Sequence, residues 1–420
     1  MLSPKSTETV RATLPAVGGA VGEITTLFYD KLFAAHPQLL RDLFNRGNQA
    51  NGEQQQALAG AIAAFATALV EHPDVRPDAM LSRIAHKHAS LGISREQYKV
   101  VHLHLFAAIT EVLGDAVTPE VAAAWDEVYW LMANALIALE ARLYEQAGAL
   151  HGATWRSCTV VERRQETADV ATFVVRPDGG GQAPDFRPGQ YVSVQVTLPD
   201  GARQIRQYSL SGRLDDALQF SVKRVAGDPA GEVSNHLHDH LDVGHTLDIS
   251  HPFGDVALDD GDHPVLLASA GIGCTPMIAM LGHLADTGSA RRVIAAHADR
   301  SESDHAFRAD LDQLTAKLPD AVAHVWYERP EGAWPADRTG LADLSRLDIP
   351  AGTTAYLCGP PALPPRGPRP AARRGRGRRR HPLRGLRPRP VARRGVTVPD
   401  ATEPGAAQPP GTHPPIVTHA

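Results

Sequence analysis

A histidine at position 88 is the residue of this sequence that could most directly bind a metal. Leu81, Ile84, His88 and Leu91 recur at spacings of three and four, so they share one face of a predicted helix. His86 is two residues from Ile84 and points to another side. An imidazole on an apolar face can bind a metal or be an ordinary core histidine with satisfied hydrogen bonds. Taken alone, His88 leaves both interpretations open.

A second group of residues could hold phosphates and an aromatic ring system. The string Arg206-Gln207-Tyr208-Ser209 closes a predicted strand. Its arginine offers a rigid fork for phosphate, its tyrosine an aromatic plane for a flavin, and its serine a hydroxyl. Alone, the string also fits a charged, half-buried strand. With Arg187-Pro-Gly189-Gln-Tyr191 before it and Gly231-Glu-Val-Ser234-Asn235 after it, the trio resembles ferredoxin-reductase-type domains that bind FAD.

A glycine-containing loop lies where a predicted buried strand meets a predicted helix. It comprises Gly271, Ile272, Gly273, Cys274, Thr275 and Pro276. Glycines let the backbone approach a pyrophosphate and a helix N-terminus favours anions, although tight strand–helix packing would need the same residues. The loop is not a GxGxxG fingerprint; it resembles the nicotinamide loop of the same reductases, and residues 356–360 resemble their later nicotinamide-facing loop. Residues 299–301 could hold a 2′-phosphate or form a solvated loop, which leaves NADH and NADPH open.

The elements that must position these residues divide the sequence into three domains. Residues 1–150 are rich in strong helix formers without a convincing strand, so we predict an all-α domain. Residues 153–262 carry short, evenly spaced β-rich runs between turn residues, which predict a small antiparallel β-barrel. Residues 263–362 alternate strands and helices, a pattern typical of a doubly wound α/β domain.

The composition favours a protein of the reducing cytoplasm. The three cysteines among 420 residues are far apart, which argues against a disulfide framework or a zinc site. No apolar run reaches the ~18 residues of a membrane span, and no signal peptide is visible. We therefore expect a cytoplasmic monomer with small-molecule substrates, without a nucleic-acid partner.

Several strings in the helical domain occur in a recognisable order. They are Phe28-Tyr29-Asp30-Lys31-Leu-Phe33, Leu43-Phe44-Asn45, Asn48-Gln-Ala-Asn51-Gly52-Glu-Gln54, Ile84-Ala-His-Lys87-His88 and Glu96-Gln97-Tyr98. Together they resemble the globin domain of flavohaemoglobins. The resemblance implies haem b with His88 as the iron ligand, Phe44 packed on the haem and Lys87 near the haem edge.

The same resemblance assigns further side chains around the haem. Tyr29, Gln54 and Leu58 would line its distal side, where a tyrosine hydroxyl can donate a hydrogen bond to dioxygen. Tyr98 and Glu140 would hydrogen-bond the iron-binding histidine. A carboxylate behind such an imidazole gives it imidazolate character, which favours oxygen activation over simple storage.

The implied function is nitric oxide dioxygenation. Reducing equivalents would pass from NAD(P)H to FAD and then singly to the haem, where dioxygen and nitric oxide give nitrate. Two alternatives stay open: an oxygen-binding globin with an impaired reductase half, and a flavin-dependent NAD(P)H reductase with a sensory globin.

The resemblance stops at Leu363. From there the sequence has thirteen arginines and no lysine, and residues 364–395 are almost wholly Arg, Pro, Gly and Ala. Such a segment cannot offset its ordering entropy by burying apolar surface, so we predict that residues 363–420 are disordered and that the nicotinamide domain is incomplete. Flavohaemoglobins continue with a helix and a final strand, and the aromatic residue of a motif like I-H-Y-E-V-F-G-P packs on the flavin; neither element is expected here.

The tail also suggests why the resemblance stops. Codons for the family motif, read one nucleotide early, can give the residues at 381–391. We therefore interpret the tail as frameshifted, which rereading the coding DNA would test. The competing interpretation is a true basic tail for nucleic acid or an anionic membrane.

Overall fold

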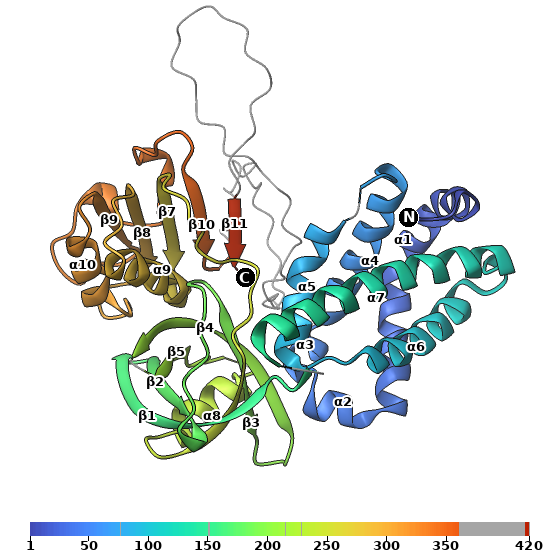
Figure 1. The fold of residues 1–420 in the computed structure, drawn as a ribbon, viewed down its shortest axis with the longest axis horizontal. Coiled ribbons are helices and arrows are strands. Elements are labelled where there is room, and N and C mark those ends of the chain that lie inside the picture. Colours follow the sequence, from blue (N-terminus) through green and yellow to red (C-terminus); the bar gives the residue numbers. More distant parts are fainter. Residues whose placement is uncertain (76, 150–151, 215, 228, 361–415, 420) are drawn as a thin grey trace, which may run out of the picture.

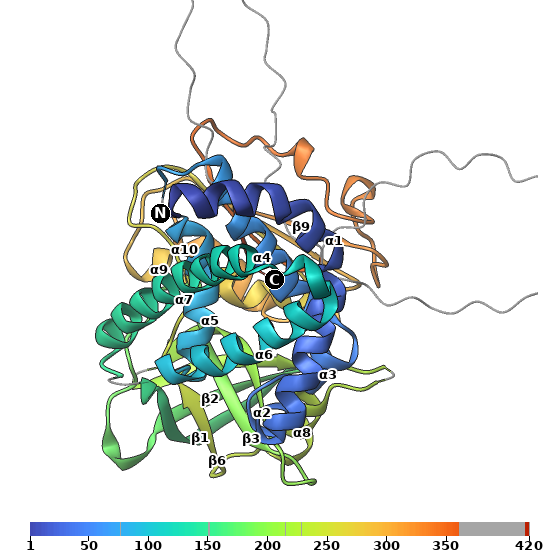
Figure 2. The same cartoon turned by 90° about the vertical axis from the view of Figure 1, so that its right-hand side faces the viewer.

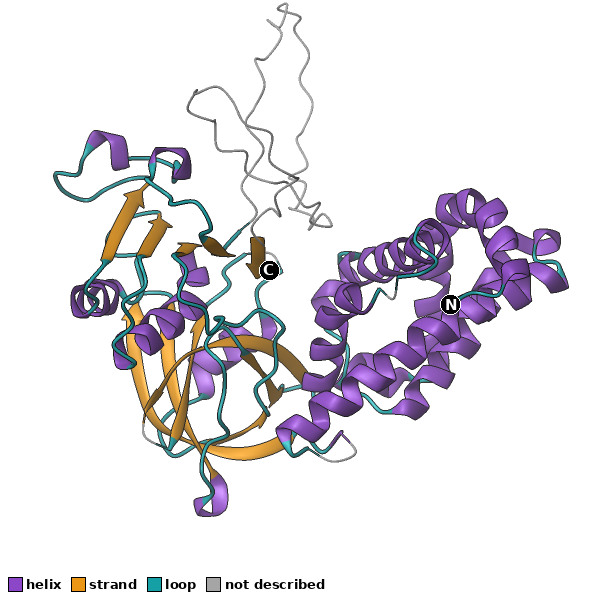
Figure 3. Ribbon diagram, turned by 45° about the horizontal axis from the view of Figure 1, so that its top comes forward, coloured by secondary structure: helices purple, strands orange, loops and turns teal. Residues whose placement is uncertain are grey.

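The computed structural model describes residues 1–75, 77–149, 152–214, 216–227 and 229–360, and the backbone of 416–419. The predicted architecture is confirmed: a helical domain, a closed antiparallel barrel and an α/β domain follow one another along the chain (Figure 1). Figure 3 shows the helices of the first domain on one side and the two sheets on the other. Among the described helices, none has both the length and the apolar character needed to cross a bilayer.

Helices of the first domain begin at capping residues that can be recognised in the sequence. Its helices are α1 (Pro4–Ala35), α2 (Pro37–Asp42), α3 (Arg46–Ala50), α4 (Glu53–Glu71), α5 (Asp78–Leu91), α6 (Arg95–Leu113) and α7 (Pro119–Ala147). Ser3 and Thr118 are N-caps whose side chains accept from Ser6 N and Val121 N, each followed by a proline that suits the first turn.

The end of α5 is fixed by a glycine. Gly92 adopts φ 74°, a left-handed conformation that ends the helix, and its N–H reaches the carbonyls of Ala89 and His88. A Cβ at Gly92 would lie 2.9 Å from the Gly152 carbonyl oxygen, in the segment that leads into the barrel. The helix that carries His88 therefore ends directly against the start of the next domain.

The barrel is formed by β1 (Trp155–Thr167), β2 (Val170–Pro177), β3 (Tyr191–Thr197), β4 (Arg203–Leu214), β5 (Ala217–Lys223) and β6 (Thr246–Ser250). Its strand order is β1-β2-β5-β4-β3-β6, and antiparallel pairing of β6 with β1 closes it. The interior is apolar, with Phe173 and Phe220 stacked at 5.7 Å between ring centroids. The short helix α8 (Glu232–His240) packs against this barrel, and α2 and α3 of the first domain lie beside it (Figure 2).

The third domain is a parallel sheet of order β11-β10-β7-β8-β9. Its elements are β7 (Val265–Ala270), α9 (Cys274–Asp286), β8 (Val293–Asp299), α10 (Arg308–Lys317), β9 (Ala321–Tyr327), β10 (Thr354–Cys358) and β11 (Ile416–His419). The helices flank the sheet, so its central strands are buried on both faces and read as continuous apolar runs.

The last strand corrects an expectation. The sequence predicts a sheet without a final strand and a disordered tail, but Ile416–His419 pairs in parallel with β10. The open edge of β10 offers unpaired backbone groups, and Ile, Val and Thr have high β-propensity. The strand does not carry the family motif or its aromatic residue. The disorder and the frameshift predicted for the rest of the tail concern residues that lie outside the described ones.

Candidate functional site

One cavity of about 1,090 Å³ opens onto all three domains. Most of the residues predicted to bind cofactors line it: Tyr29, Phe44, Gln54, Leu58, Lys87, His88 and Tyr98 from the helices; Tyr191, Gln207, Tyr208 and Ser209 from the barrel; and Gly271, Ile272, Gly273 and Thr275 from the α/β domain. Segments that are far apart in the sequence therefore meet at one site.

His88 is oriented by two buried side chains behind it. Its Nδ1 lies 2.8 Å from Glu140 Oε1 and 3.0 Å from the Tyr98 hydroxyl, which itself donates to the same carboxylate oxygen at 2.5 Å. Because a carboxylate accepts, Nδ1 carries the proton. Burial, and then the charge of Glu140, raises the pKa of Tyr98, so the hydroxyl keeps its proton. The arrangement leaves Nε2 of His88 as the nitrogen that can bind a ligand.

The donor set around this imidazole fits a haem. Nε2 of His88 has no hydrogen bond to any described residue, and the ring lines the cavity. In the part of the chain that the structure describes, no three His, Cys, Asp or Glu residues form a metal-binding group. His36 and His88 both line this large, mostly apolar cavity, and of the two His88 is the one with a carboxylate behind it. One protein imidazole is enough to hold haem iron, because the macrocycle supplies other nitrogen ligands. As its helical face predicts, His86 lies elsewhere, where its Nδ1 accepts from Gly254 N at 3.0 Å.

The lining of the cavity also contains a buried tyrosine. Tyr29 lies on α1, and its ring meets Phe44 edge-on at 5.8 Å and stacks on Phe33 at 5.6 Å. Burial raises the pKa of Tyr29 to about 12, and a hydrogen bond with Gln54 acts in the opposite direction. The hydroxyl is therefore protonated near neutral pH and available as a donor inside the cavity.

A closed set of polar contacts joins the helix of His88 to the barrel. Lys87 Nζ donates to Gln207 Oε1, and Gln207 Nε2 donates to Ser193 Oγ at 2.9 Å. Ser193 Oγ donates to Ser90 Oγ at 2.9 Å, which returns to the Lys87 carbonyl at 2.8 Å. The accessible surface of Lys87 faces the cavity; burial, then the nearby Arg206, lowers its pKa to about 7. The haem side and the flavin side thus share one polar junction.

Some of the predicted flavin residues line the cavity, whereas Arg206 lies behind its wall. Tyr208 lines the cavity and stacks on Phe220 at 5.7 Å. Arg206 does not line it: its guanidinium lies 3.6 Å from Glu232 at the start of α8, and burial lowers its pKa. Ser221 and Lys223 of β5 do line the cavity and were not singled out from the sequence. The alternation of side chains along β5 could have indicated them, because every second residue of a strand shares a face.

The nicotinamide loop and residues 358–360 touch one another, and two glycines make this contact possible. A Cβ at Gly273 would lie 2.4 Å from the Cys358 carbonyl oxygen, and one at Gly359, where φ is 153°, would lie 2.9 Å from Ala270. Gly271 instead has φ 52° and open space in front of it, which leaves its backbone accessible. Such a bare backbone at the start of α9 fits a nucleotide phosphate.

Two members of the predicted loop do not line the large cavity. Cys274 is buried, and its thiol reaches the Ala306 carbonyl at 3.8 Å; Pro276 is buried in the first turn of α9. Cys274 belongs to the apolar core of the α/β domain, and α9 packs both on β7 and on β4 of the barrel. The contribution of Cys274 and Pro276 to a site is the path of the backbone.

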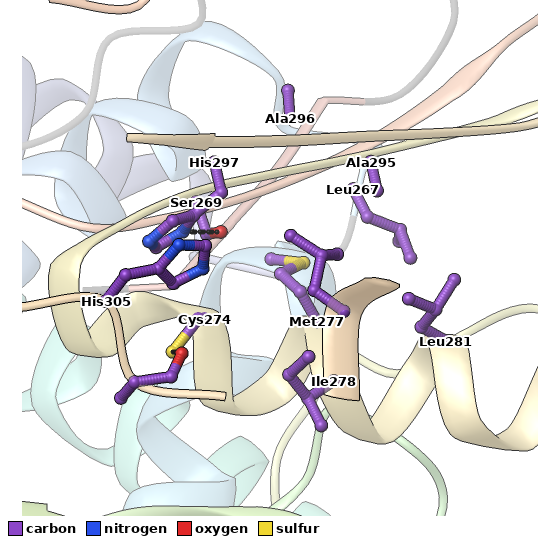
Figure 4. A pocket seen from close by; sticks show the side chains of 12 residues that line it. Leu267, Ser269, Cys274, Met277, Ile278, Leu281, Ala295, Ala296, His297 and His305 are labelled. Carbon is purple, nitrogen blue, oxygen red and sulfur yellow. Dashed lines mark hydrogen bonds between the residues drawn. The ribbon is translucent and has the colours of Figure 1, made fainter. Parts of the chain in front are cut away.

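A separate small cavity of about 20 Å³ lies beneath this loop (Figure 4). There Ser269 Oγ lies 2.9 Å from His297 Nδ1, and the rings of His297 and His305 stack at 4.0 Å. His305 Nδ1 lies 2.9 Å from the Tyr327 hydroxyl. This space is too small for a dinucleotide, so its polar groups serve to support the loop.

The residues after β8 are already paired with one another. Asp299 Oδ1 accepts from Arg300 N at 2.8 Å, and Arg300 Nη2 lies 2.5 Å from Asp304 and 3.4 Å from Asp169. Ser301 Oγ donates to Asp304 at 2.9 Å. A 2′-phosphate at this point would have to compete with two carboxylates for the guanidinium.

Family models match all three domains. Residues 26–136 match the globin family, residues 157–257 the oxidoreductase FAD-binding domain and residues 267–365 the oxidoreductase NAD-binding domain. Each match falls on the domain whose residues were assigned to that cofactor.

Whole-length relatives combine the same three parts. The flavohemoprotein of Bordetella parapertussis is 42% identical over 373 residues, covering 86% of this chain and 92% of the relative. That of Chromobacterium violaceum is 40% identical over 375 residues, with the same coverage of both chains, 86% and 92%. A crystal structure of flavohemoglobin from Malassezia yamatoensis with bound FAD and heme superposes with a TM-score of 0.79 at 38% identity, covering 86% of this chain and 92% of that one.

Proposed function

The chain belongs to the flavohaemoglobin family, and we propose that it is a nitric oxide dioxygenase, which oxidises nitric oxide to nitrate with dioxygen and NAD(P)H. It is an NAD(P)H-dependent haem oxidoreductase with FAD. The observation that carries the proposal is the single cavity that His88, Tyr208 and Gly271 all line. A common cavity supports direct electron transfer between the cofactors within one chain.

When bound, haem supplies the iron at which the two gases react, and FAD turns a hydride from NAD(P)H into single electrons. His88 would bind the iron through Nε2, since Nδ1 is committed to Glu140. The carboxylate increases the basicity of the imidazole, a second-shell effect that tunes the electron density at the iron. Tyr98 holds the same carboxylate in place at 2.5 Å.

Within the same cavity, the Tyr29 hydroxyl would donate a hydrogen bond to dioxygen, and Gln54 would orient that hydroxyl. Tyr208 and Ser209 would contact FAD, with Arg206 supporting them from the side of Glu232. The backbone from Gly271 to Thr275 would hold the nicotinamide nucleotide at the N-terminus of α9.

Two linked measurements test the proposal on the haem- and FAD-loaded protein. NADH or NADPH is first added anaerobically while visible spectra are recorded; we expect the flavin to bleach and the haem then to become ferrous. Nitric oxide is next added with dioxygen, and we expect its NAD(P)H-dependent consumption with nitrate as the product. A haem that stays ferric with NAD(P)H but is reduced by dithionite would instead identify an oxygen-binding globin with an impaired reductase half.

Replacing the proposed iron ligand distinguishes a dioxygenase from the remaining alternative, a flavin reductase with a sensory globin. In His88→Ala, nitric oxide consumption should be lost while the flavin still reduces ferricyanide. If nitric oxide consumption persists without the haem ligand, the dioxygenase proposal fails and a flavin reductase with a sensory globin is favoured.

A further inference from the structure

One buried glutamine of the barrel reaches into the haem domain. Gln204 lies on β4, two residues before Arg206, and is 0% exposed. Its Nε2 lies 3.0 Å from the Arg41 carbonyl oxygen, 3.3 Å from that of Phe44 and 3.4 Å from that of Leu40. These carbonyls belong to the end of α2 and the turn after it, where a helix leaves its last C=O groups without partners. A side chain of the flavin domain therefore completes a helix end of the globin domain.

The other end of the same amide faces the flavin strand. Gln204 Oε1 accepts from Arg46 N at 3.3 Å and from Arg206 Nη1 at 3.3 Å. Arg206 belongs to the string predicted to hold FAD. One amide group thus contacts both the corner between α2 and α3 and the guanidinium of the flavin strand.

The corner that Gln204 holds forms a wall of the large cavity. The ring of Phe44 lines that cavity and meets both Tyr29, at 5.8 Å, and Phe33, at 5.3 Å, edge-on. A shift of the Phe44 backbone would therefore move the part of the cavity lining that contacts Tyr29.

Ion pairs also join the two domains at this corner, but they are less constraining. Arg46 pairs with Asp200 at 2.6 Å and with Glu232 at 2.8 Å, and these side chains are partly exposed. Exposed pairs are screened by solvent and contribute little. The Gln204 side chain is itself fully buried and its hydrogen bonds are part-buried, so breaking them costs more than breaking an exposed ion pair. Figure 2 shows α2 and α3 beside the barrel, next to α8.

We propose that Gln204 is a positioning residue that couples the flavin site to the haem site by fixing Phe44 relative to Arg206. The inference rests on the proposed function in one respect, the assignment of haem beside His88 and of FAD beside Arg206. Occupation of the flavin site changes the surroundings of the Arg206 guanidinium, and Gln204 passes that change to the wall beside Tyr29. The coupling is reciprocal, so a ligand at the haem also changes the affinity for FAD.

The test compares FAD-loaded and FAD-stripped protein, each with ferrous haem and carbon monoxide as the probe. We measure the C–O stretching band by infrared spectroscopy and the carbon monoxide association rate by flash photolysis. In the wild-type chain, removal of FAD should shift or broaden the band and change the association rate by about threefold or more. A change of this size is the order expected when one hydrogen bond is weakened.

Gln204→Met keeps the length of the side chain and removes its hydrogen bonds. We expect this variant to show the altered band and rate even with FAD bound, and to respond no further when FAD is removed. Gln195→Met, on β3, is the matched control and should behave as the wild type. Gln204→Glu retains the acceptor toward Arg206 but loses both donors toward the corner, so it should resemble Gln204→Met.

The outcomes are separable from those of the proposed function. An equal response to FAD removal in the wild-type chain and in both Gln204 variants would overturn the coupling. Ferricyanide reduction by NAD(P)H reports whether each variant has folded with its flavin; if Gln204→Met does not fold, Gln204→Glu and the wild-type comparison still decide. Because carbon monoxide binding needs only haem, the coupling can be observed even if nitric oxide is not converted to nitrate.

Discussion

The surroundings of His88 and of His305 differ in one decisive way. Both histidines use Nδ1 to contact a tyrosine hydroxyl, His88 that of Tyr98 at 3.0 Å and His305 that of Tyr327 at 2.9 Å. Of these two histidines, His88 alone also has a carboxylate on that nitrogen, Glu140 at 2.8 Å, and His88 alone lines the large cavity. His305 is stacked on another imidazole beside a cavity of about 20 Å³.

The comparison teaches that residue type does not separate a ligand from a structural histidine. A carboxylate fixes the proton on one nitrogen and leaves the other to bind a metal, whereas burial without a carboxylate keeps the ring neutral. For His305, burial and the neighbouring His297 lower the pKa to about 2. The same kind of histidine–tyrosine pair thus stands at the proposed iron site in one region and supports packing in the other.

The largest effect is expected at the iron ligand. Among the described residues, His88 is the histidine that both lines the cavity and contacts Glu140. In His88→Ala the purified protein should therefore contain little haem and lack a Soret band of normal intensity. The control is His86→Ala, which removes a contact to Gly254 N and should retain haem. Full haem content in His88→Ala would show that another residue binds the iron, and the proposed difference in role between His88 and His305 would be wrong.

The next effect concerns the carboxylate that distinguishes the two histidines. Glu140→Gln keeps the shape of the side chain but removes its charge, and loss of such a second-shell partner typically costs about 10- to 100-fold in metal affinity or activity. We expect nitric oxide turnover to fall within that range while flavin reduction by NAD(P)H, measured by stopped flow, is unchanged. Unchanged turnover would show that the carboxylate does not tune the ligand.

On the distal side, Tyr29→Phe removes a protonated donor from the cavity. A hydrogen bond to a charged acceptor is worth about 1.5–3 kcal/mol, so the dioxygen dissociation rate of the ferrous haem should rise by roughly 10- to 100-fold. Tyr144→Phe is the control, because the Tyr144 side chain does not line the cavity and its hydroxyl is committed to the Ile93 carbonyl at 2.8 Å. Equal dissociation rates in the two variants would remove Tyr29 from the oxygen site.

The smallest expected effect concerns His305, the structural histidine of the comparison, and the pH dependence of stability. Below pH 6.5 the unfolded chain binds a proton at His305 and the folded chain does not, so stability is complete above that pH and falls as the pH decreases toward 2. At pH 5.5 the expected loss is about 1.4 kcal/mol relative to pH 7.5. In His305→Asn, which can keep a partner for Tyr327, urea unfolding should lack this part of the pH dependence. The same slope in variant and wild type would contradict it; His72→Asn, at an exposed position, is the control.

Sequence reasoning predicted what depends on short-range pattern. The helical face containing Leu81, Ile84 and His88 correctly separates His88 from His86, because that information lies within one helix. The contact of His88 with Glu140 lies 52 residues away, and only the resemblance indicated it. Gln204 was missed altogether, since nothing local marks a glutamine whose partners lie more than 150 residues earlier in the chain.

At the C-terminus, the amino-acid composition did not predict the strand that pairs with β10. A tail rich in arginine and proline argues for disorder, yet Ile416–His419 forms a strand because β10 presents an open edge in the right place. That edge belongs to the tertiary structure and is not visible in the tail itself. The frameshift stays a prediction, which sequencing the coding DNA around codon 363 decides.

The close approach of Gly92 to Gly152 has a consequence for engineering. The helix of His88 ends with its backbone against the first residues of the barrel, with 2.9 Å between a would-be Cβ and the Gly152 oxygen. A chimaera that exchanges reductases by cutting between the domains near residue 150 would separate these two glycines. The transferable module is therefore defined by both surfaces of that contact, and a graft that introduces any larger residue at position 92 would displace the end of the helix that carries His88.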